Sequence, residues 1–206
     1  MSLNTESNKR IFERYLPDAA VDYCFDLWMN GKFDFNITRS RHSKLGDYSF
    51  DPNTGRHRVT VNHDLNKYAF LITYIHEVAH KKTFDLHQNR VSPHGHEWKT
   101  QFKKLILPLL NKDVFPTDVL APLAYHMRNP KASSVRDAAL QTALNNHDQK
   151  PKGILLRDIN IGQKFLFKKK TYLKLDTKRT RCLCEHINTG RRYLISQSAP
   201  VSAFKN

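Results

Sequence analysis

Residues 65–80 form an almost continuous apolar stretch, in which only Lys67 and Glu77 carry a charge. A helix that is apolar nearly all round is normally buried inside a domain. The stretch therefore predicts a buried helix. Asp64 or Asn62 is expected to cap its start, because either side chain can accept a hydrogen bond from a free backbone N–H.

Shorter patterns before this stretch predict a helix, a strand and a hairpin. A proline at the start and a glycine just past the end delimit a helix over 16–31. Cys24 lies in its apolar face and is expected to be a small core residue. Residues 33–38 alternate between apolar and polar, which is typical of a half-buried strand. Two β-rich segments around a turn predict the hairpin; they are 48–50 and 58–62, with the turn at 51–55.

A second long helix is predicted over roughly 93–111. Ser92 and Pro93 suit the N-cap and the first helical position. Apolar residues then recur at helical spacing. This assignment places His94 in the first turn of the helix.

The last third of the chain changes character. A short helix from about 115 to 127 and a small polar helix over 135–147 precede a polar linker at 149–153. Beyond the linker, short apolar segments separated by turn residues predict a small antiparallel barrel or curled sheet. Five strands are expected, at 154–156, 164–167, 171–175, 180–184 and 192–195.

These elements predict an α+β protein with two domains. The first, over 8–130, is expected to pack helices on a small antiparallel sheet. Residues 131–151 are expected to form a linker region with a short helix, and residues 152–204 a small basic β-rich module.

The net charge of +15 is spread unevenly along the 206 residues. Residues 151–206 hold 13 basic and three acidic side chains, a net charge of +10, against +5 for residues 1–150. A basic surface of this kind favours a polyanion partner, with nucleic acid as the first candidate. A merely soluble, solvated surface is the alternative.

Other features narrow the class of protein. No stretch reaches 18 apolar residues, so we expect no membrane span and no membrane partner. Residues 1–10 lack the apolar core of a signal peptide. Three widely spaced cysteines argue against a disulfide scaffold. Cytoplasmic residence is therefore expected.

The chemistry is concentrated in His76-Glu77-Val78-Ala79-His80, which has the pattern H-E-x-x-H. Residues four apart lie on the same side of a helix, so the two imidazoles can hold one metal ion. Zinc lowers the pKa of a bound water to roughly 7, and the adjacent Glu77 can take its proton. The pattern is typical of zinc peptidases. Two core histidines and a chance glutamate are the alternative.

A catalytic zinc site needs a third protein ligand. His94 is the candidate, since Gly95 beside it permits a close approach of two backbones. His63, His87 and His96 are nearby competitors. His96 points about 200° away from His94 on a helix and is a poor substitute, and His87 is expected in the loop after the first helix. Three imidazoles also suit divalent metals other than zinc.

The chain resembles the SprT-like family, which includes the Spartan proteases. The resemblance covers roughly residues 10–130 and rests on H-E-x-x-H followed by H-G-x-E-[FW]; the matching residues are His76, Glu77, His80, His94, Gly95, Glu97 and Trp98. It implies a zincin-type metallopeptidase fold, with one zinc ion on His76, His80 and His94 and with Glu77 as general base. In the animal members it implies cleavage of proteins crosslinked to DNA.

The resemblance also suggests how a substrate is held. In zincins the strand just before the H-E-x-x-H helix often lines the cleft, where an extended peptide can pair with it; an ordinary sheet strand is the alternative. Tyr125, His126 and His96 are candidates for contacting the substrate or donating a hydrogen bond to the oxyanion. Packing or surface roles are the alternative for each.

The C-terminal module departs from the family. Many SprT-like proteins end in a zinc ribbon with two C-x-x-C pairs, whereas this chain has only Cys182-x-Cys184 followed by His186. A closed structural zinc site needs four ligands, so no second zinc is expected. Family knowledge about recruitment to DNA therefore does not transfer directly.

Basic and aromatic residues alternate in the module, as on many nucleic-acid surfaces. The same alternation also permits aromatic residues inside and lysines outside. The candidate nucleic-acid contacts are Lys164, Lys168, Lys169, Lys170, Lys174, Arg191 and Arg192.

The sequence thus predicts a zinc metalloendopeptidase acting on DNA-associated or DNA-crosslinked protein. A non-catalytic nucleic-acid-associated regulatory protein, with a structural or vestigial zinc site, is the competing hypothesis. Glu77 favours catalysis, because a purely structural site has no use for a base. A module that contacts protein instead of nucleic acid is a further alternative.

Overall fold

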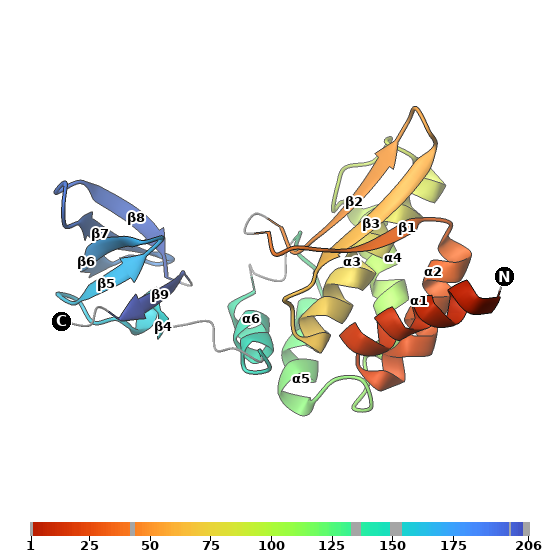
Figure 1. Ribbon diagram of the computed structural model, residues 1–206, viewed down its shortest axis with the longest axis horizontal. Helices are drawn as coiled ribbons and strands as arrows, with labels where there is room; N and C mark the ends of the chain where they lie inside the picture. The colour runs from red at the N-terminus through yellow and green to blue at the C-terminus, as the bar shows by residue number, and fades with distance from the viewer. Residues whose placement is uncertain (1, 42–43, 133–136, 149–153, 198, 204–206) are drawn as a thin grey trace. The chain divides into compact units, whose positions relative to one another are not determined.

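The computed structural model describes the chain except residues 1, 42–43, 133–136, 149–153, 198 and 204–206. It divides into two compact units, Met1–Gln149 and Lys150–Asn206. The predicted α+β class is confirmed, since the first unit combines helices with a three-stranded sheet and the second holds a six-stranded sheet (Figure 1). Among the described residues, no helix has both the length and the hydropathy needed to cross a bilayer.

The first unit contains the elements α1 (Ser2–Tyr15), α2 (Val21–Gly31), β1 (Asp34–Thr38), β2 (Gly46–Asp51), β3 (Arg56–Asn62), α3 (Lys67–His87), α4 (His96–Ile106), α5 (Thr117–His126) and α6 (Ala138–Asn145), with 3₁₀ turns at Asp18–Ala20 and Leu107–Leu109. The helix α1 has no counterpart among the predicted elements, because its sequence is mostly polar. Phe12 anchors it in the core, where its ring meets that of Phe25 edge to face at 5.6 Å.

The sheet of the first unit is mixed, which corrects the prediction of an antiparallel one. Its order is β1-β3-β2. The hairpin partners β2 and β3 are antiparallel, as expected, whereas β1 and β3 are parallel. The hairpin inserts its second strand between β1 and β2. As a result, β3 is the central strand and β2 is the edge.

The helix α3 crosses the unit beside this sheet, as Figure 1 shows. Its predicted burial is confirmed, because Leu71, Tyr74, Ile75 and Val78 are fully buried. The cap is Asn66, not the expected Asp64 or Asn62. Its side-chain oxygen accepts hydrogen bonds from the N–H groups of residues 68 and 69 at 3.1 and 2.9 Å. The helix also continues seven residues past His80.

The helix α6 belongs to the core of the first unit. Leu140 and Leu144 are buried in the same hydrophobic cluster as α3. The amide of Asn66 donates a 2.8 Å hydrogen bond to the Leu144 carbonyl. The helix expected over 135–147 is therefore amphipathic rather than polar, and it packs on α5. The linker predicted at 149–153 lies outside the described residues.

The second unit contains β4 (Ile154–Leu155), a 3₁₀ turn at Leu156–Asp158, β5 (Lys164–Phe167), β6 (Lys170–Thr177), β7 (Arg181–His186), β8 (Arg192–Ser196) and β9 (Pro200–Ala203). The sheet order is β4-β9-β5-β6-β7-β8, and each pair of neighbouring strands is antiparallel. The predicted strands are present, and β9 is an additional one. Phe165 and Tyr172 are buried in the core of the second unit, whereas Tyr193 is 43% exposed.

The prediction that Lys174 contacts nucleic acid is wrong. Its side chain is buried, at 3% exposure. The ammonium donates hydrogen bonds to the carbonyls of Leu156, Arg157 and Ile159 at 3.0, 3.3 and 2.6 Å. A buried ammonium needs such acceptors to replace water. Lys174 thus ties the 3₁₀ turn to β6 and is not available to a phosphate.

Candidate metal centre

Three imidazoles meet at one point of the first unit. The Nε2 atoms of His76 and His94 are 3.1 Å apart, those of His80 and His94 are 3.0 Å apart, and those of His76 and His80 are 3.3 Å apart. Among the described residues, these three histidines are the group of histidine, cysteine or acidic side chains that could hold a metal ion.

The triangle has the dimensions of a metal site. Three nitrogens bound to a tetrahedral zinc ion at about 2.0 Å are about 3.3 Å from one another. The observed separations of 3.0 to 3.3 Å are close to this value. The donor set fits a metal ion, and it does not select zinc over the other transition metals that imidazole binds.

The chain brings the ligands together in two ways. His76 and His80 are one turn apart on α3, where side chains four residues apart share a face. His94 precedes α4 in the left-handed conformation, with φ of 61°. The helix starts at His96 with Gly95 as N-cap, so the prediction that His94 lies in its first turn is wrong. A non-glycine residue in the left-handed conformation lowers the stability of the fold by about 1–2 kcal/mol. The backbone conformation that directs the His94 side chain therefore costs stability.

A tryptophan supports all three rings. Trp98 is fully buried, and its ring centroid lies 4.6 Å from His76, 5.3 Å from His80 and 4.7 Å from His94. Its Nε1 donates a long hydrogen bond of 3.4 Å to the His76 carbonyl. The sequence placed Trp98 on the apolar side of a helix, and only the fold shows that it lies against the histidines.

Burial keeps the helical histidines neutral. Removal from water, followed by the neighbouring imidazoles, lowers the pKa of His76 to about 2 and that of His80 to about 4. A metal ligand must offer an unprotonated nitrogen. Both rings are therefore in the ligand form at neutral pH.

Glu77 lies beside the triangle and is 7% exposed. Burial, and secondly the nearby Asp47, raise the pKa of its carboxyl to about 8, while a hydrogen bond from the Tyr48 backbone N–H acts in the opposite direction. A dication next to the carboxyl would also favour the charged form. The group can therefore exchange a proton near neutral pH, as a general base requires.

The segment before β2 is fixed by Asn62 at the end of β3. Its buried amide donates to the carbonyls of Arg41 and Lys44 at 3.2 and 3.0 Å, and its oxygen accepts from Arg41 Nε at 2.9 Å. The backbone N–H of Asn62 also donates to the Leu45 carbonyl at 2.9 Å. This network sets the position of Gly46, which packs directly on Glu77. The sequence suggested only a capping role for Asn62.

The triangle opens into a cleft of about 690 Å³, lined by residues 46–50 of β2, by α3 and by the segment 88–94. This volume is within the range of roughly 300–1,000 Å³ found for ligand sites. In the described part of the sheet, the edge strand beside the cleft is β2. The strand directly before α3 is the central β3, so the expectation that this strand lines the cleft is wrong.

The other candidate histidines lie outside the triangle. His63 and His96 are exposed. His87 is the last residue of α3, not part of a loop. Tyr125 is 69% exposed, and its ring contacts Arg128.

His126 is different, because it is buried near the centre. Its Nδ1 is 3.2 Å from Asp137 Oδ2, and it lines a cavity of about 160 Å³ together with His76 and Glu77. Burial lowers its pKa, against the effect of the Asp137 hydrogen bond. The structure thus brings one of the three predicted oxyanion or substrate residues, His126, near the histidine triangle.

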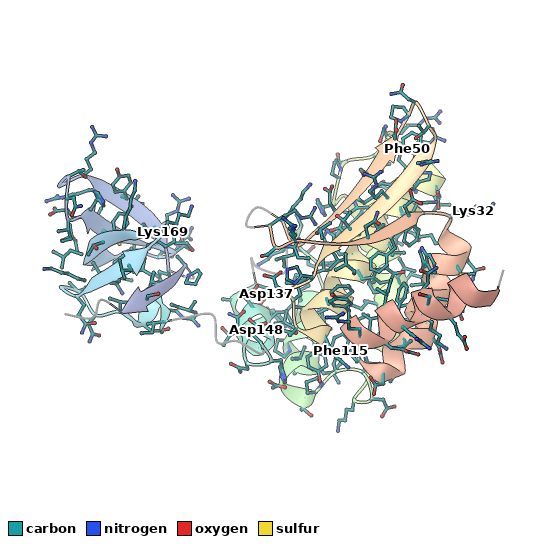
Figure 2. All side chains as sticks on the ribbon, viewed as in Figure 1. Lys32, Phe50, Phe115, Asp137, Asp148 and Lys169 are labelled. Carbon is teal, nitrogen blue, oxygen red and sulfur yellow. The ribbon has the colours of Figure 1, made fainter. Side chains whose placement is uncertain are left out.

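In the second unit, the exposed members of the predicted nucleic-acid set are Lys164, Lys168, Lys169, Lys170, Arg191 and Arg192. Lys168 and Lys169 form the turn between β5 and β6, with φ of 49° and 63° (Lys169 is labelled in Figure 2). They line a shallow cavity of about 370 Å³ with Leu166 and residues 200–202. Cys182 and Cys184 are both buried, and Cys184 Sγ donates to the Cys182 carbonyl.

Comparisons with known proteins add no relative, since no family model, curated protein or solved structure matches this chain.

Proposed function

We propose that this chain is a zinc-dependent metalloendopeptidase of the SprT-like family with a zincin-type first domain. The observation that carries the proposal is the triangle of His76, His80 and His94 Nε2 atoms with Glu77 beside it in an open cleft. A purely structural zinc site is closed by four protein ligands. Three converging ligands, a buried carboxyl and room for a peptide support catalysis instead.

Each of these residues would have its own role in the reaction. His76, His80 and His94 would hold the ion. When bound, zinc would lower the pKa of a water molecule to about 7 and polarise the scissile carbonyl. Glu77 would take the proton of the attacking water and return it to the leaving amine. An extended substrate would pair with the free edge of β2.

His126 is the residue we favour for a supporting role at the oxyanion. Asp137 holds its Nδ1 side, and the ring lines the small cavity that His76 and Glu77 also line. Tyr125 and His96 are less suitable, because both side chains are exposed to solvent.

We propose further that the second unit holds nucleic acid, so that the substrates are DNA-associated or DNA-crosslinked proteins. Support comes from the net charge of +10 over residues 151–206 and from the two exposed lysines of the β5–β6 turn. Such binding should weaken steeply as salt rises. The competing candidate is a non-catalytic nucleic-acid-associated protein with the same metal site, for which Glu77 would have no role.

The test combines zinc content with proteolysis. Wild type and Glu77→Gln are loaded with zinc and incubated with a basic DNA-binding protein, with and without single-stranded DNA. One zinc ion in both proteins, with cleavage by the wild type alone, would establish catalysis. Zinc in both without any cleavage would favour the competing candidate, and absence of zinc from the replenished wild type would overturn the whole proposal.

A further inference from the structure

The cleft beside the triangle differs chemically between its two ends. Near the start of β2 it is lined by the charged residues Lys44 and Asp47. Toward the end of β2 it is lined by Phe50 and Phe84, whose rings are in contact. Among the described lining residues, Lys44, Asp47 and Glu77 are the ones that carry a formal charge, and all three belong to the first end or the centre.

The apolar end has an ordered wall. The ring centroids of Phe50 and Phe84 are 4.5 Å apart, and His57 lies 4.8 Å and 5.3 Å from them. Tyr48 closes the cluster with a 2.9 Å hydrogen bond between its hydroxyl and His57 Nδ1. Phe50, near the tip of the hairpin in Figure 2, and Phe84 both remain partly exposed to the cleft.

The wall begins next to the reacting centre. Phe84 follows His80 by four residues on α3, so the two side chains share a face about 6 Å apart along the helix. The ring of Tyr48 is parallel to that of His80, at 6.4 Å, and lies 6.2 Å from Phe84. An extended peptide rises about 3.4 Å per residue. The wall is therefore within one or two residues of a bond held at the triangle.

We propose that Phe50 and Phe84 form the specificity subsite of the enzyme and accept an apolar substrate side chain, such as Leu, Met or Phe, within two residues of the scissile bond. This inference rests on the proposed peptidase function. A partly exposed apolar wall in a cleft gains by covering itself with an apolar group. A charged substrate side chain would lose water there without a partner, which is unfavourable.

The expected selectivity is moderate. Differences of one or a few methylene groups in an apolar pocket change kcat/KM by roughly 10–200-fold. We therefore expect cleavage sites with Leu, Met or Phe at one fixed position to exceed those with Ala or Gly there by at least about tenfold. The other positions should show weaker preferences.

The experiment maps cleavage sites by mass spectrometry after digestion of a proteome-derived peptide library with the zinc-loaded full chain. The test variant is Phe50→Glu, which should shift the preference toward Lys or Arg at the same position. The matched control is Leu86→Glu, an identical change of charge at a residue of α3 that is 63% exposed and lies outside the cleft lining. The control should keep the wild-type preference.

The outcomes separate the two proposals. If zinc-loaded wild type cuts no peptide, the peptidase function fails. If it cuts without an apolar preference, or if Phe50→Glu retains zinc and the wild-type preference, the subsite is wrong. Should Phe50→Glu lose its zinc, Phe50→Ala takes its place, with a reduced preference for Phe over Ala as the expected result and an unchanged one as the contradicting result.

Discussion

Gly46 and Glu77 are packed so closely that a single methyl group does not fit between them. A Cβ atom on Gly46 would lie 2.7 Å from Oε1 and 2.8 Å from Cγ of Glu77, and 2.6 Å from the methyl group of Thr73. Real Cβ atoms do not approach other atoms this closely. The start of β2 therefore sets the position of the proposed general base from the side opposite its own helix.

Gly46→Ala should for this reason reduce kcat while leaving zinc bound. A displacement of a reacting group by about 1 Å can lower the rate about 100-fold, and we expect a loss of that order. Gly55→Ala is the control in the same hairpin. Its added Cβ meets nothing within 4 Å, but its φ is 67°, so it should cost about 1 kcal/mol of stability and leave kcat intact. Equal kcat values for wild type and Gly46→Ala would contradict the positioning role.

The identity of the third ligand can be tested with two neighbouring histidines. His94→Ala should abolish stoichiometric zinc binding after dialysis, because two imidazoles alone form an incomplete site. His96→Ala removes an exposed ring two residues away and should retain one zinc ion per chain. Elemental analysis of both proteins decides the question. Zinc retained by His94→Ala and lost from His96→Ala would reverse the assignment.

Metal removal should destabilise the first unit alone, because each unit has its own hydrophobic core. A ligand present at 100 times its Kd stabilises the folded state by about 2.7 kcal/mol. For a unit of this size the chelated protein should then melt roughly 5–10 °C lower. Tryptophan fluorescence reports on this unit specifically, since Trp28 and Trp98 are the tryptophans of the chain. His94→Ala, treated in the same way, should show no shift.

The elements with a clear local signal could be predicted from the sequence. The apolar stretch of α3 and the alternation in β1 identify a helix and a strand without knowledge of the fold. The parallel pairing of β1 with β3 could not be predicted, because it depends on where the hairpin inserts in the sheet. The helix α1 was not predicted, because Phe12 contributes to the core only through the partners that the fold supplies.

At the site too, some features have a local signal in the sequence and others depend on the fold. The spacing of His76 and His80 predicts one shared face, and the structure brings His94 to them. The left-handed backbone of His94 has no signal in the sequence, since neither glycine nor asparagine occupies the position. The roles of Gly46 and Asn62 come from contacts between segments far apart in the chain. Lys174 looked like other lysines of the module, and only its burial distinguishes it.

Lys174→Ala should unfold the second unit more readily. The change leaves three carbonyls without their charged donor, and hydrogen bonds to charged groups contribute about 1.5–3 kcal/mol each. We expect a loss of about 3 kcal/mol in total, because the turn at 156–158 can partly return to solvent. Lys170→Ala in the same strand is exposed and should change stability by less than about 0.5 kcal/mol. Hydrogen exchange of the amides in 154–203 measures both, and equal protection in the two variants would refute the role of Lys174.

Substitutions in the β5–β6 turn can test nucleic-acid binding without disturbing the fold. Two-residue turns with positive φ at both positions prefer Asn-Gly, whereas this chain has Lys168 and Lys169 there. Replacing them with Asn and Gly should therefore keep or raise the stability of the second unit while removing two positive charges. Affinity for duplex DNA should fall, and the slope of log K against log salt should become smaller by about 2.

Lys104→Gln with Lys112→Gln removes the same number of charges from exposed positions in the first unit. This control should leave the salt slope unchanged if DNA binds at the turn. Titrations of fluorescent DNA from low to physiological salt measure both variants. An equal loss of slope in the two would mean that the net charge of the chain, not the turn, is responsible for binding.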